Sequence, residues 1–415
     1  MSDYIAGLDI GTTKIGAIIA EVNGNNEPTI IGVGTSPSNG LRRGVVVNLD
    51  KTVRSIQNAM EEAERTAGVE VNEVFAGIAG DHIRSINGRG VVAVAGQNHE
   101  ITQGDVRRVI DAAKALALPI DREILHILPQ EFTVDDQHGI KDPVGMSGVR
   151  LEAKVHIVTG AITSAQNIYR SIARADMQVM DLVLEPLASS YAVLDNDEKE
   201  LGVIVMDLGG GTTDIAMFFE GCVRHTSVVG LGGKNVTNDI AIGLRTPMDQ
   251  AEQIKIEHGC AIHKDTDCDE FIEVPDVGGR SPRRISKAYL VEIIQPRMEE
   301  TLSLAYREIK KSNYVHLMTS GLVLTGGGSL LRGTVELAED IFEMPVKLGV
   351  PERFSGLTDL VQSPIYATGV GLVHYGIHHK YEVGDLFGHD EQGLFAWVLN
   401  RMRRWYSSIQ QRSTH

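Results

Sequence analysis

The sequence has few cysteines, no basic leader and no long apolar run, and each absence excludes a class of protein. Its 415 residues contain only Cys222, Cys260 and Cys268. Three cysteines favour a reducing compartment over a disulfide framework, so we expect no bridge. The start lacks a basic stretch followed by an apolar one, which argues against a secretory signal. No apolar run reaches the roughly 20 residues of a spanning helix. We therefore expect a chain that stays in the cytosol without crossing a membrane.

Positive charge is also scarce. The formal net charge is -16, which argues against nonspecific binding to nucleic acid, because phosphates demand a basic surface. Residues 394–415 are the exception, with four arginines and no acidic residue. The length predicts two or more domains. The sequence thus indicates an acidic multidomain body with a basic tail.

Two distant segments share one order of residue types. Residues 5–20 and residues 201–218 each contain an apolar stretch, an aspartate, a hydrophobe, glycine, two threonines and a second apolar stretch. Apolar and β-branched residues on both sides of a Gly/Thr turn predict a strand hairpin in each segment. We interpret the pair as a distant internal repeat.

The residue types in these hairpins suit a polyphosphate. Glycines let backbone N–H groups approach phosphate oxygens, threonine hydroxyls donate further hydrogen bonds, and Lys14 adds a point charge. Asp9 and Asp207, at strand ends, could hold Mg²⁺ through its water shell, because the ion keeps several waters beside nucleotide phosphates. Either hairpin alone could be an ordinary tight turn, since short glycine-rich motifs are weak signals. The duplication favours two facing halves of one phosphate clamp.

A third glycine cluster lies at residues 325–328. It follows a strand pattern at 322–325 and precedes a helical pattern at 334–342. Backbone can approach a nucleoside closely at such a glycine turn. An ordinary strand-to-helix turn is the alternative, but its place after both hairpins favours a ligand-binding role.

In this order, the motifs at residues 9–14, 207–214 and 325–328 resemble the phosphate-1, phosphate-2 and adenosine motifs of the actin, DnaK and sugar-kinase superfamily. The resemblance implies an actin-like α/β fold with two lobes around a cleft that binds ATP with Mg²⁺. Residues 182–191 resemble the first connecting helix, where many members carry a residue that orients the attacking water. Glu185 is the catalytic candidate there. The structural alternative is a Glu-Pro helix start, with the acid near the positive end of the helix dipole.

Residues 251–259 resemble the segment of bacterial actins that meets the ribose and adenine. Glu252 and Lys255 are three residues apart and so lie on one helical face. A solvated ion pair is the alternative. The preceding residues 230–240 are similar to the superfamily's glycine-rich start of this subdomain, which favours nucleotide contact. The residues thus assigned to the nucleotide are Asp9, Gly11, Thr12, Thr13, Lys14, Asp207, Gly209, Gly210, Gly211, Thr212, Thr213, Gly233, Lys234, Asn235, Glu252, Lys255, Gly326, Gly327, Gly328 and Ser329.

Within the superfamily, the chain resembles the FtsA family of bacterial cell division proteins over nearly its whole length. The segments that carry the resemblance are residues 39–46, 126–132, 139–150, 274–280 and 356–359. It implies an inserted subdomain in place of one actin subdomain. The expected layout is a first-lobe core at 1–82, 159–195 and 363–383, the insertion at 83–158, a second-lobe core at 196–229 and 315–362, an outer second-lobe subdomain at 230–314, and a linker at 384–393.

Two other clusters invite different interpretations. The spacing of His258, Cys260, His263 and Cys268 fits no regular zinc pattern. Residues 278–287 concentrate four cations without an acid, and a solvated basic loop is one interpretation of them. The resemblance to FtsA implies binding of the carboxy-terminal peptide of FtsZ on this subdomain, and we expect Arg283, Arg284 and Arg297 to contribute.

The end of the chain has the pattern of an amphipathic helix, residues 394–415. Apolar side chains recur at steps of three and four residues, and arginines flank them. Such a helix lies in the membrane interface and meets anionic lipid; docking on the protein's own core is the alternative. The residues assigned to the membrane are Leu394, Phe395, Val398, Arg401, Met402, Arg404 and Trp405.

The resemblance implies a scaffold with slow ATP hydrolysis at most. We expect it to polymerise on the cytoplasmic face of the cell membrane at midcell, to anchor FtsZ and to recruit later division proteins. A sugar or acyl kinase of the same superfamily has no use for a membrane tail, and a chaperone would carry a further peptide-binding domain. PilM of pilus assembly, which is FtsA-like, is the closer alternative.

Overall fold

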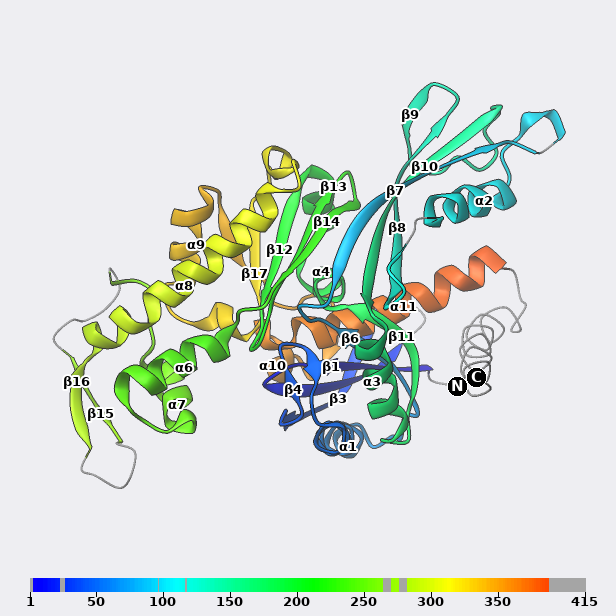
Figure 1. Cartoon of the computed structure of the whole chain (residues 1–415). Helices are drawn as coiled ribbons and strands as arrows, with labels where there is room; N and C mark the ends of the chain where they lie inside the picture. Colours follow the sequence, from blue (N-terminus) through cyan, green and yellow to red (C-terminus); the bar gives the residue numbers. More distant parts are fainter. Residues whose placement is uncertain are drawn as a thin grey trace.

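The computed structural model describes residues 3–22, 27–95, 97–115, 118–263, 270–275 and 282–387. These residues form two α/β lobes and a smaller subdomain that projects from the first lobe (Figure 1). Each of the three parts has its own sheet and a group of buried apolar side chains. The arrangement confirms the expected actin-like α/β architecture with an inserted subdomain.

The first lobe is built on a six-stranded sheet with the order β11-β6-β1-β2-β3-β19. Its strands are β1 (Asp3–Ile10), β2 (Lys14–Val22), β3 (Pro28–Pro37), β6 (Glu73–Ile78), β11 (Gln178–Leu184) and β19 (Ser355–Gly356). Its helices are α1 (Leu49–Ala67), α3 (Ile162–Ala173), α4 (Glu185–Val193), α10 (Thr358–Val361) and α11 (Ala367–Phe387). A short hairpin, β4 (Leu41–Arg42) and β5 (Val45–Val46), precedes α1.

The second lobe repeats this topology. Its five-stranded sheet has the order β14-β13-β12-β17-β18. The strands are β12 (Val203–Leu208), β13 (Thr213–Phe219), β14 (Cys222–Val229), β17 (Leu322–Thr325) and β18 (Val346–Leu348). In both lobes an antiparallel meander of three strands is joined, at its first strand, by a parallel neighbour: β6 beside β1 and β17 beside β12. The internal repeat predicted from the sequence is therefore a repeat of sheet topology.

The outer part of the second lobe is mainly helical. It contains α6 (Gly233–Leu244), α7 (Met248–His258), β15 (Phe271–Val274), β16 (Arg283–Ser286) and the long helix α8 (Lys287–Lys310). The remaining helices are α5 (Asn196–Leu201), before β12, and α9 (Thr334–Phe342), which packs on α8. Apolar residues of α8 recur at helical spacing, and Leu290, Ile294 and Leu302 are buried in the core of the second lobe.

The inserted subdomain is a four-stranded antiparallel sheet with the order β7-β10-β8-β9 and one covering helix. Its elements are β7 (Arg84–Ala93), α2 (Gln103–Lys114), β8 (Arg122–Val134), β9 (Gln137–Ile140) and β10 (Arg150–Ala161). Thr102 caps α2: its Oγ1 accepts the backbone N–H of Asp105, and its own backbone N–H donates to Asp105 Oδ2, which fixes the start of this helix.

The insertion also contacts the second lobe along β14. Gln130 Nε2 donates to the backbone oxygen of Val223 at 2.8 Å, and His156 Nε2 lies 2.9 Å from Thr226 Oγ1. Burial, together with the neighbouring His225, lowers the pKa of His156 to about 3. The ring is therefore neutral at physiological pH, and it joins the insertion to the second lobe through its hydrogen bond to Thr226 and an edge contact with the His225 ring.

Two boundaries differ from the sequence-based layout. β19 lies within the range assigned to the second lobe, but it pairs with β3 of the first lobe, and Leu357 N donates to Ile30 O at 3.0 Å. The first lobe therefore resumes before residue 363. Helix α11 runs to Phe387, so residues 384–387 of the predicted linker are helical. Neither the pairing of β19 nor the extension of α11 to Phe387 has a signal in the sequence.

The predicted amphipathic helix lies outside the described residues, as do the rest of the linker, Cys268 and residues 278–281 at the start of the basic loop. Among the helices that the structure does describe, none is long and apolar enough to span a membrane. Cys222 and Cys260 are free thiols.

Candidate nucleotide-binding cleft

The tips of the two predicted phosphate hairpins face each other across the lobes. A β-carbon added to Gly210 would lie 2.4 Å from Thr13 Cγ2, and one added to Gly211 would lie 2.5 Å from Thr12 Oγ1. Only glycine fits at these two positions, because any side chain would enter the opposite hairpin. The structure thus brings together the residues that the sequence assigned to one clamp.

Thr12 is held from both lobes. Its Oγ1 accepts the backbone N–H of Gly44 at 3.0 Å, within the first lobe. Its backbone oxygen accepts a hydrogen bond from Lys234 Nζ of α6 at 2.9 Å, across the cleft. Burial lowers the pKa of Lys234, against the attraction of Glu252. The first hairpin is therefore positioned by the second lobe as well as by its own.

Four carboxyl groups gather below the hairpin tips. Asp9 and Asp207 are the residues before the last of β1 and β12, Asp214 is the second residue of β13, and Glu185 is the first residue of α4. Burial raises the pKa of Asp9 to about 6 and that of Asp214 to about 7, and the neighbouring carboxylates add to both shifts. Burial, then Asp9, Asp214 and Asp207, hold the pKa of Glu185 well above its usual value. The cluster therefore brings together carboxyl groups whose ionised forms a bound cation would stabilise.

One lysine is present within this cluster. Burial lowers the pKa of Lys14, while the charges of Asp9 and Asp207 oppose the shift. Its Nζ donates to Ile365 O at 3.3 Å and lies 4.1 Å from the centre of the Tyr366 ring. The ammonium is thus held beside the acids, on the first-lobe side, where a phosphate chain would pass.

Two hydroxyls fix Asp207, and sequence reasoning missed both. Ser189 Oγ and Thr368 Oγ1 lie 3.0 and 3.1 Å from Asp207 Oδ2, and they are 3.0 Å from each other. Burial raises the pKa of Asp207, and these hydrogen bonds oppose the shift. Ser189 lies one helical turn after Glu185, which is a signal in the sequence; Thr368, in α11, carries none.

The donor set suits Mg²⁺ bound through its water shell. Asp214 Oδ2 accepts from Thr212 Oγ1 at 2.7 Å, whereas its buried Oδ1 has no hydrogen-bond partner in the structure. Over the described ranges, no three His, Cys, Asp or Glu side chains converge into a direct metal-binding cluster. A buried carboxylate oxygen without a hydrogen-bond partner, in a site that lacks a direct set of metal ligands, fits a cation that is bound through its water shell beside phosphates. Asp214 therefore joins Asp9 and Asp207 as a candidate holder of the ion.

Glu185 fits both interpretations made from the sequence. It is the first residue of α4, with Pro186 after it, as in an ordinary helix start. Its side chain also lies over β6, where a β-carbon on Gly77 would be 3.1 Å from Glu185 Cγ. Burial and the neighbouring carboxylates raise its pKa, which favours the protonated carboxyl.

The predicted nucleoside residues form one hydrogen-bonded group at the start of α6. Lys255 Nζ donates to Glu252 Oε2 at 2.8 Å and to Thr237 Oγ1 at 3.1 Å, and the Thr237 hydroxyl also bonds Glu252. Gly233 N donates to Gly209 O at 2.9 Å, which joins this group to the second hairpin. Asn235 Oδ1 accepts from Gly232 N at 3.1 Å and so serves the helix start. The i, i+3 pair thus lies beside the cleft.

The third glycine cluster lies against the same acids. Gly326 has a φ of 80°, and a β-carbon on it would be 2.2 Å from Asp207 Oδ1. A β-carbon on Gly328 would be 2.8 Å from Leu208 O, and Ser329 Oγ donates to Gly326 O at 2.6 Å. Three glycine-rich turns that are far apart in the sequence therefore meet at one cleft.

The three arginines assigned to a partner do not form one free cluster. Arg297 pairs with Asp239 of α6 and with Glu300, and these contacts raise its pKa. Arg283 bonds Leu244 O, and the Arg284 guanidinium lies 5.0 Å from the centre of the Phe271 ring. Arg283 and Arg284 are exposed. The residues assigned to the membrane lie outside the described part of the chain.

Two lobes with repeated sheets, two facing hairpins and a third glycine turn over a carboxylate cluster define an actin-like protein. A family model described as "Cell division protein FtsA" matches residues 204–371, and one described as "SHS2 domain inserted in FTSA" matches residues 80–159. A cell division protein FtsA from Pseudomonas aeruginosa is 50% identical over 407 residues, which cover 97% of each chain. The chain belongs to the FtsA family of cell division proteins.

Solved structures agree on the fold. The PilM-PilN type IV pilus biogenesis complex contains a chain that matches with a TM-score of 0.67 and 19% identity, over 90% of this chain and 98% of that one. MreB5 of Spiroplasma citri bound to ADP matches with a TM-score of 0.56 and 13% identity, over 93% and 98%. The identity to FtsA far exceeds that to PilM, so the family is FtsA rather than the pilus protein.

Proposed function

We propose that this chain is an ATP-binding adaptor of cell division, which polymerises on the cytoplasmic face of the membrane at midcell and anchors FtsZ filaments there. The observation that carries the proposal is the match to FtsA over 97% of both chains. Recruitment of later division proteins belongs to the same proposal. A small-molecule kinase is disfavoured by this family membership.

The cleft supports the ATP part of the proposal. Both hairpins offer glycine backbone and threonine hydroxyls to phosphates, and the carboxylate cluster offers a place for hydrated Mg²⁺. Glu252 and Lys255 lie beside the start of α6, on the side where a nucleoside would extend from the second hairpin. The ion would neutralise the cluster and, with the phosphates, bridge the two lobes. Hydrolysis is slow at most in this proposal, with Glu185 orienting water.

The partner sites of the proposal are the basic residues of the outer second-lobe subdomain and the tail of the chain. Arg283 and Arg284 on β16 would steer an acidic FtsZ peptide, since rim charges mainly accelerate encounter. Arg297 would act from its ion pair with Asp239. Residues 394–415 would lie on anionic lipid, and polymerisation would convert many weak tails into avid attachment.

The experiment is liposome flotation with ATP, with and without purified FtsZ. The full chain should float with anionic liposomes and carry FtsZ with it. Deleting residues 394–415 should release the chain from liposomes while binding of a fluorescent ATP analogue persists. Reversing the charge of Arg283 and Arg284 should release FtsZ alone. If the truncated chain still floats without any partner, the anchor lies elsewhere.

A further inference from the structure

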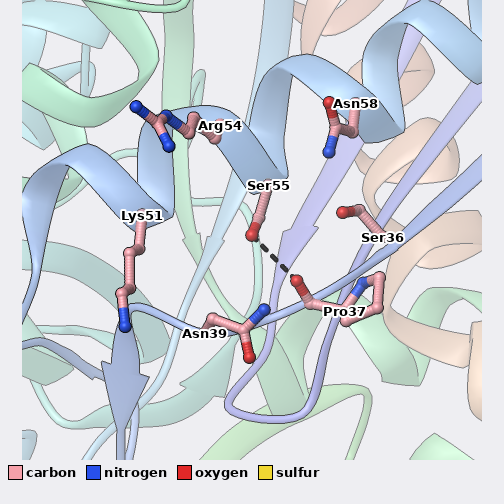
Figure 2. Close-up of a pocket in the computed structure, with 7 residues that line it drawn as sticks. All are labelled: Ser36, Pro37, Asn39, Lys51, Arg54, Ser55 and Asn58. Atoms are coloured by element: carbon pink, nitrogen blue, oxygen red, sulfur yellow. Dashed lines mark hydrogen bonds between the residues drawn. The ribbon is translucent and has the colours of Figure 1, made fainter.

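A surface pocket outside the cleft lies between the end of β3 and the first turns of α1 (Figure 2). Its volume is about 410 Å³, within the usual range of small-molecule sites. The lining residues are Ser36, Pro37, Asn39, Lys51, Arg54, Ser55 and Asn58. All but the proline are polar, and none is acidic. The pocket therefore offers hydrogen-bond donors and positive charge.

The helix wall of the pocket follows from residue spacing. Lys51, Arg54, Ser55 and Asn58 are separated by three, one and three residues, so they lie along one side of α1. The β3 wall faces them, and Ser55 Oγ donates to Pro37 O at 2.8 Å to tie the two walls together (Figure 2). The Ser36 and Ser55 side chains are buried, whereas both cations are exposed. The pocket thus has a fixed floor and a charged rim.

Neither cation at this rim is paired with the acid nearest to it along the helix. Asp50, next to Lys51, pairs with Arg174 at 2.8 Å. Glu62, further along α1, accepts the backbone N–H of Thr35 at 2.7 Å. In the part of the chain that the structure describes, neither Lys51 nor Arg54 forms a salt bridge. Two uncompensated cations in one pocket stand out in a chain with a net charge of -16.

We propose that this pocket binds a small phosphate-bearing molecule. Two cations one helical turn apart, with the amides of Asn39 and Asn58 lining the same pocket, match a group that carries close to two negative charges and three terminal oxygens. A carboxylate has two oxygens and one charge, and would leave donors without acceptors. The β3 wall also continues into the first phosphate hairpin, because Pro37 pairs with Lys14 and Ser38 N donates to Thr13 O at 3.0 Å. Because the pocket adjoins the first hairpin, the nucleotide cleft must be saturated before binding of a phosphate-bearing molecule to the pocket is measured.

The test uses the full chain with its cleft saturated by a nonhydrolysable ATP analogue and Mg²⁺. Glycerol 3-phosphate is titrated by calorimetry, with glycerol as the uncharged comparison. We expect saturable binding at one site for the phosphate ester and none for glycerol. Arg54→Gln and Lys51→Gln should each weaken binding about tenfold, as expected for loss of one hydrogen bond to a charged group.

Arg65→Gln is the matched control. Arg65 lies on the same helix, is exposed, and lines a neighbouring acidic depression with Glu61 and Glu62. Arg65→Gln removes the same charge as Arg54→Gln, but binding of glycerol 3-phosphate should be unchanged. Asn58→Trp, which fills the pocket from an exposed position, should abolish binding without loss of the ATP analogue. Absence of saturable binding to the parent chain, or an equal loss in Arg65→Gln, would overturn the proposal.

Discussion

The two phosphate hairpins share one topology but differ in chemistry. The β1–β2 hairpin carries Lys14, which lies beside the carboxylates and over Tyr366. The β12–β13 hairpin carries no cation; it carries Asp207 and Asp214, and the first of these is fixed by hydroxyls from α4 and α11 of the other lobe. A duplicated fold has thus become an asymmetric site, in which the cation comes from one copy and two of the acids from the other.

The largest expected effect comes from the contact between the hairpins. Gly210→Val should weaken binding of a fluorescent ATP analogue about 100-fold, because the added carbons enter Thr13 and overpacking costs up to ~3 kcal/mol. Gly16→Ala in the other hairpin is the control, since its β-carbon would lie 3.7 Å from Lys14, at ordinary contact distance. Equal binding by parent and Gly210→Val, with both folded, would separate the second hairpin from the nucleotide.

The cation of the first hairpin should matter next. Lys14→Gln should reduce ATP affinity about tenfold or more, because a hydrogen bond to a charged phosphate contributes roughly 1.5–3 kcal/mol. Lys234→Gln should cost less, about fivefold, since Lys234 bonds the neutral backbone oxygen of Thr12. Titrating the two variants with ATP side by side measures how much more Lys14 contributes to ATP affinity than Lys234. A larger loss in Lys234→Gln would reverse the assignment of the phosphate cation.

The hydroxyls that hold Asp207 should have a smaller effect. Thr368→Val keeps the shape of the side chain but removes one bond to Asp207 Oδ2, and Ser189 remains to hold the carboxylate. We expect a threefold to tenfold rise in the Mg²⁺ concentration needed for half-maximal ATP binding, as for loss of one ordinary hydrogen bond, about 1 kcal/mol. Thr319→Val, an exposed threonine that bonds Leu201 O, should leave it unchanged.

The pH dependence of stability tests the acidic residues of the two hairpins. The folded pKa values of Asp9, about 6, and Asp214, about 7, lie above the unfolded value of 3.8. The folded chain therefore holds protons that the unfolded chain has released, and the free energy of unfolding falls as pH rises from about 4 to 7. The melting temperature without Mg²⁺ should drop by a few degrees across this window. Asp214→Asn should reduce the drop; a flat profile in the parent chain would show that the cluster does not titrate this way.

Much of the cleft could be predicted because its glycines and threonines are local signals. A tight turn that exposes backbone N–H groups needs these residues wherever it occurs, so both hairpins and the third glycine turn stand out in the sequence. Glu252 and Lys255 were found by resemblance and helical spacing together. Thr368 was not found, since a threonine in an apolar helix is ordinary until the fold places it at Asp207.

The boundaries of the lobes were harder to predict. β19 contributes two residues to the first-lobe sheet, and no periodicity exists in so short a strand. The ion pair of Arg297 with Asp239 was not predicted, because the two residues lie far apart along the chain. Long-range pairing decides both cases, and sequence spacing does not report it.

The sequence by itself determined the hairpins and the repeat, and it predicted the chemistry of the proposed phosphate clamp, because turn geometry and phosphate contact depend on residue types a few positions apart. Only the tertiary structure decided which residues of the two lobes supply each part of the site. It joined Ser189, Asp207 and Thr368, and it raised the pKa values of the acids by burying them together. In the part of the chain that the structure describes, Lys51 and Arg54 form no ion pair with a carboxylate, and Asp50 pairs instead with Arg174. Burial and pairing are properties of the packed chain, since they depend on which distant residues come into contact.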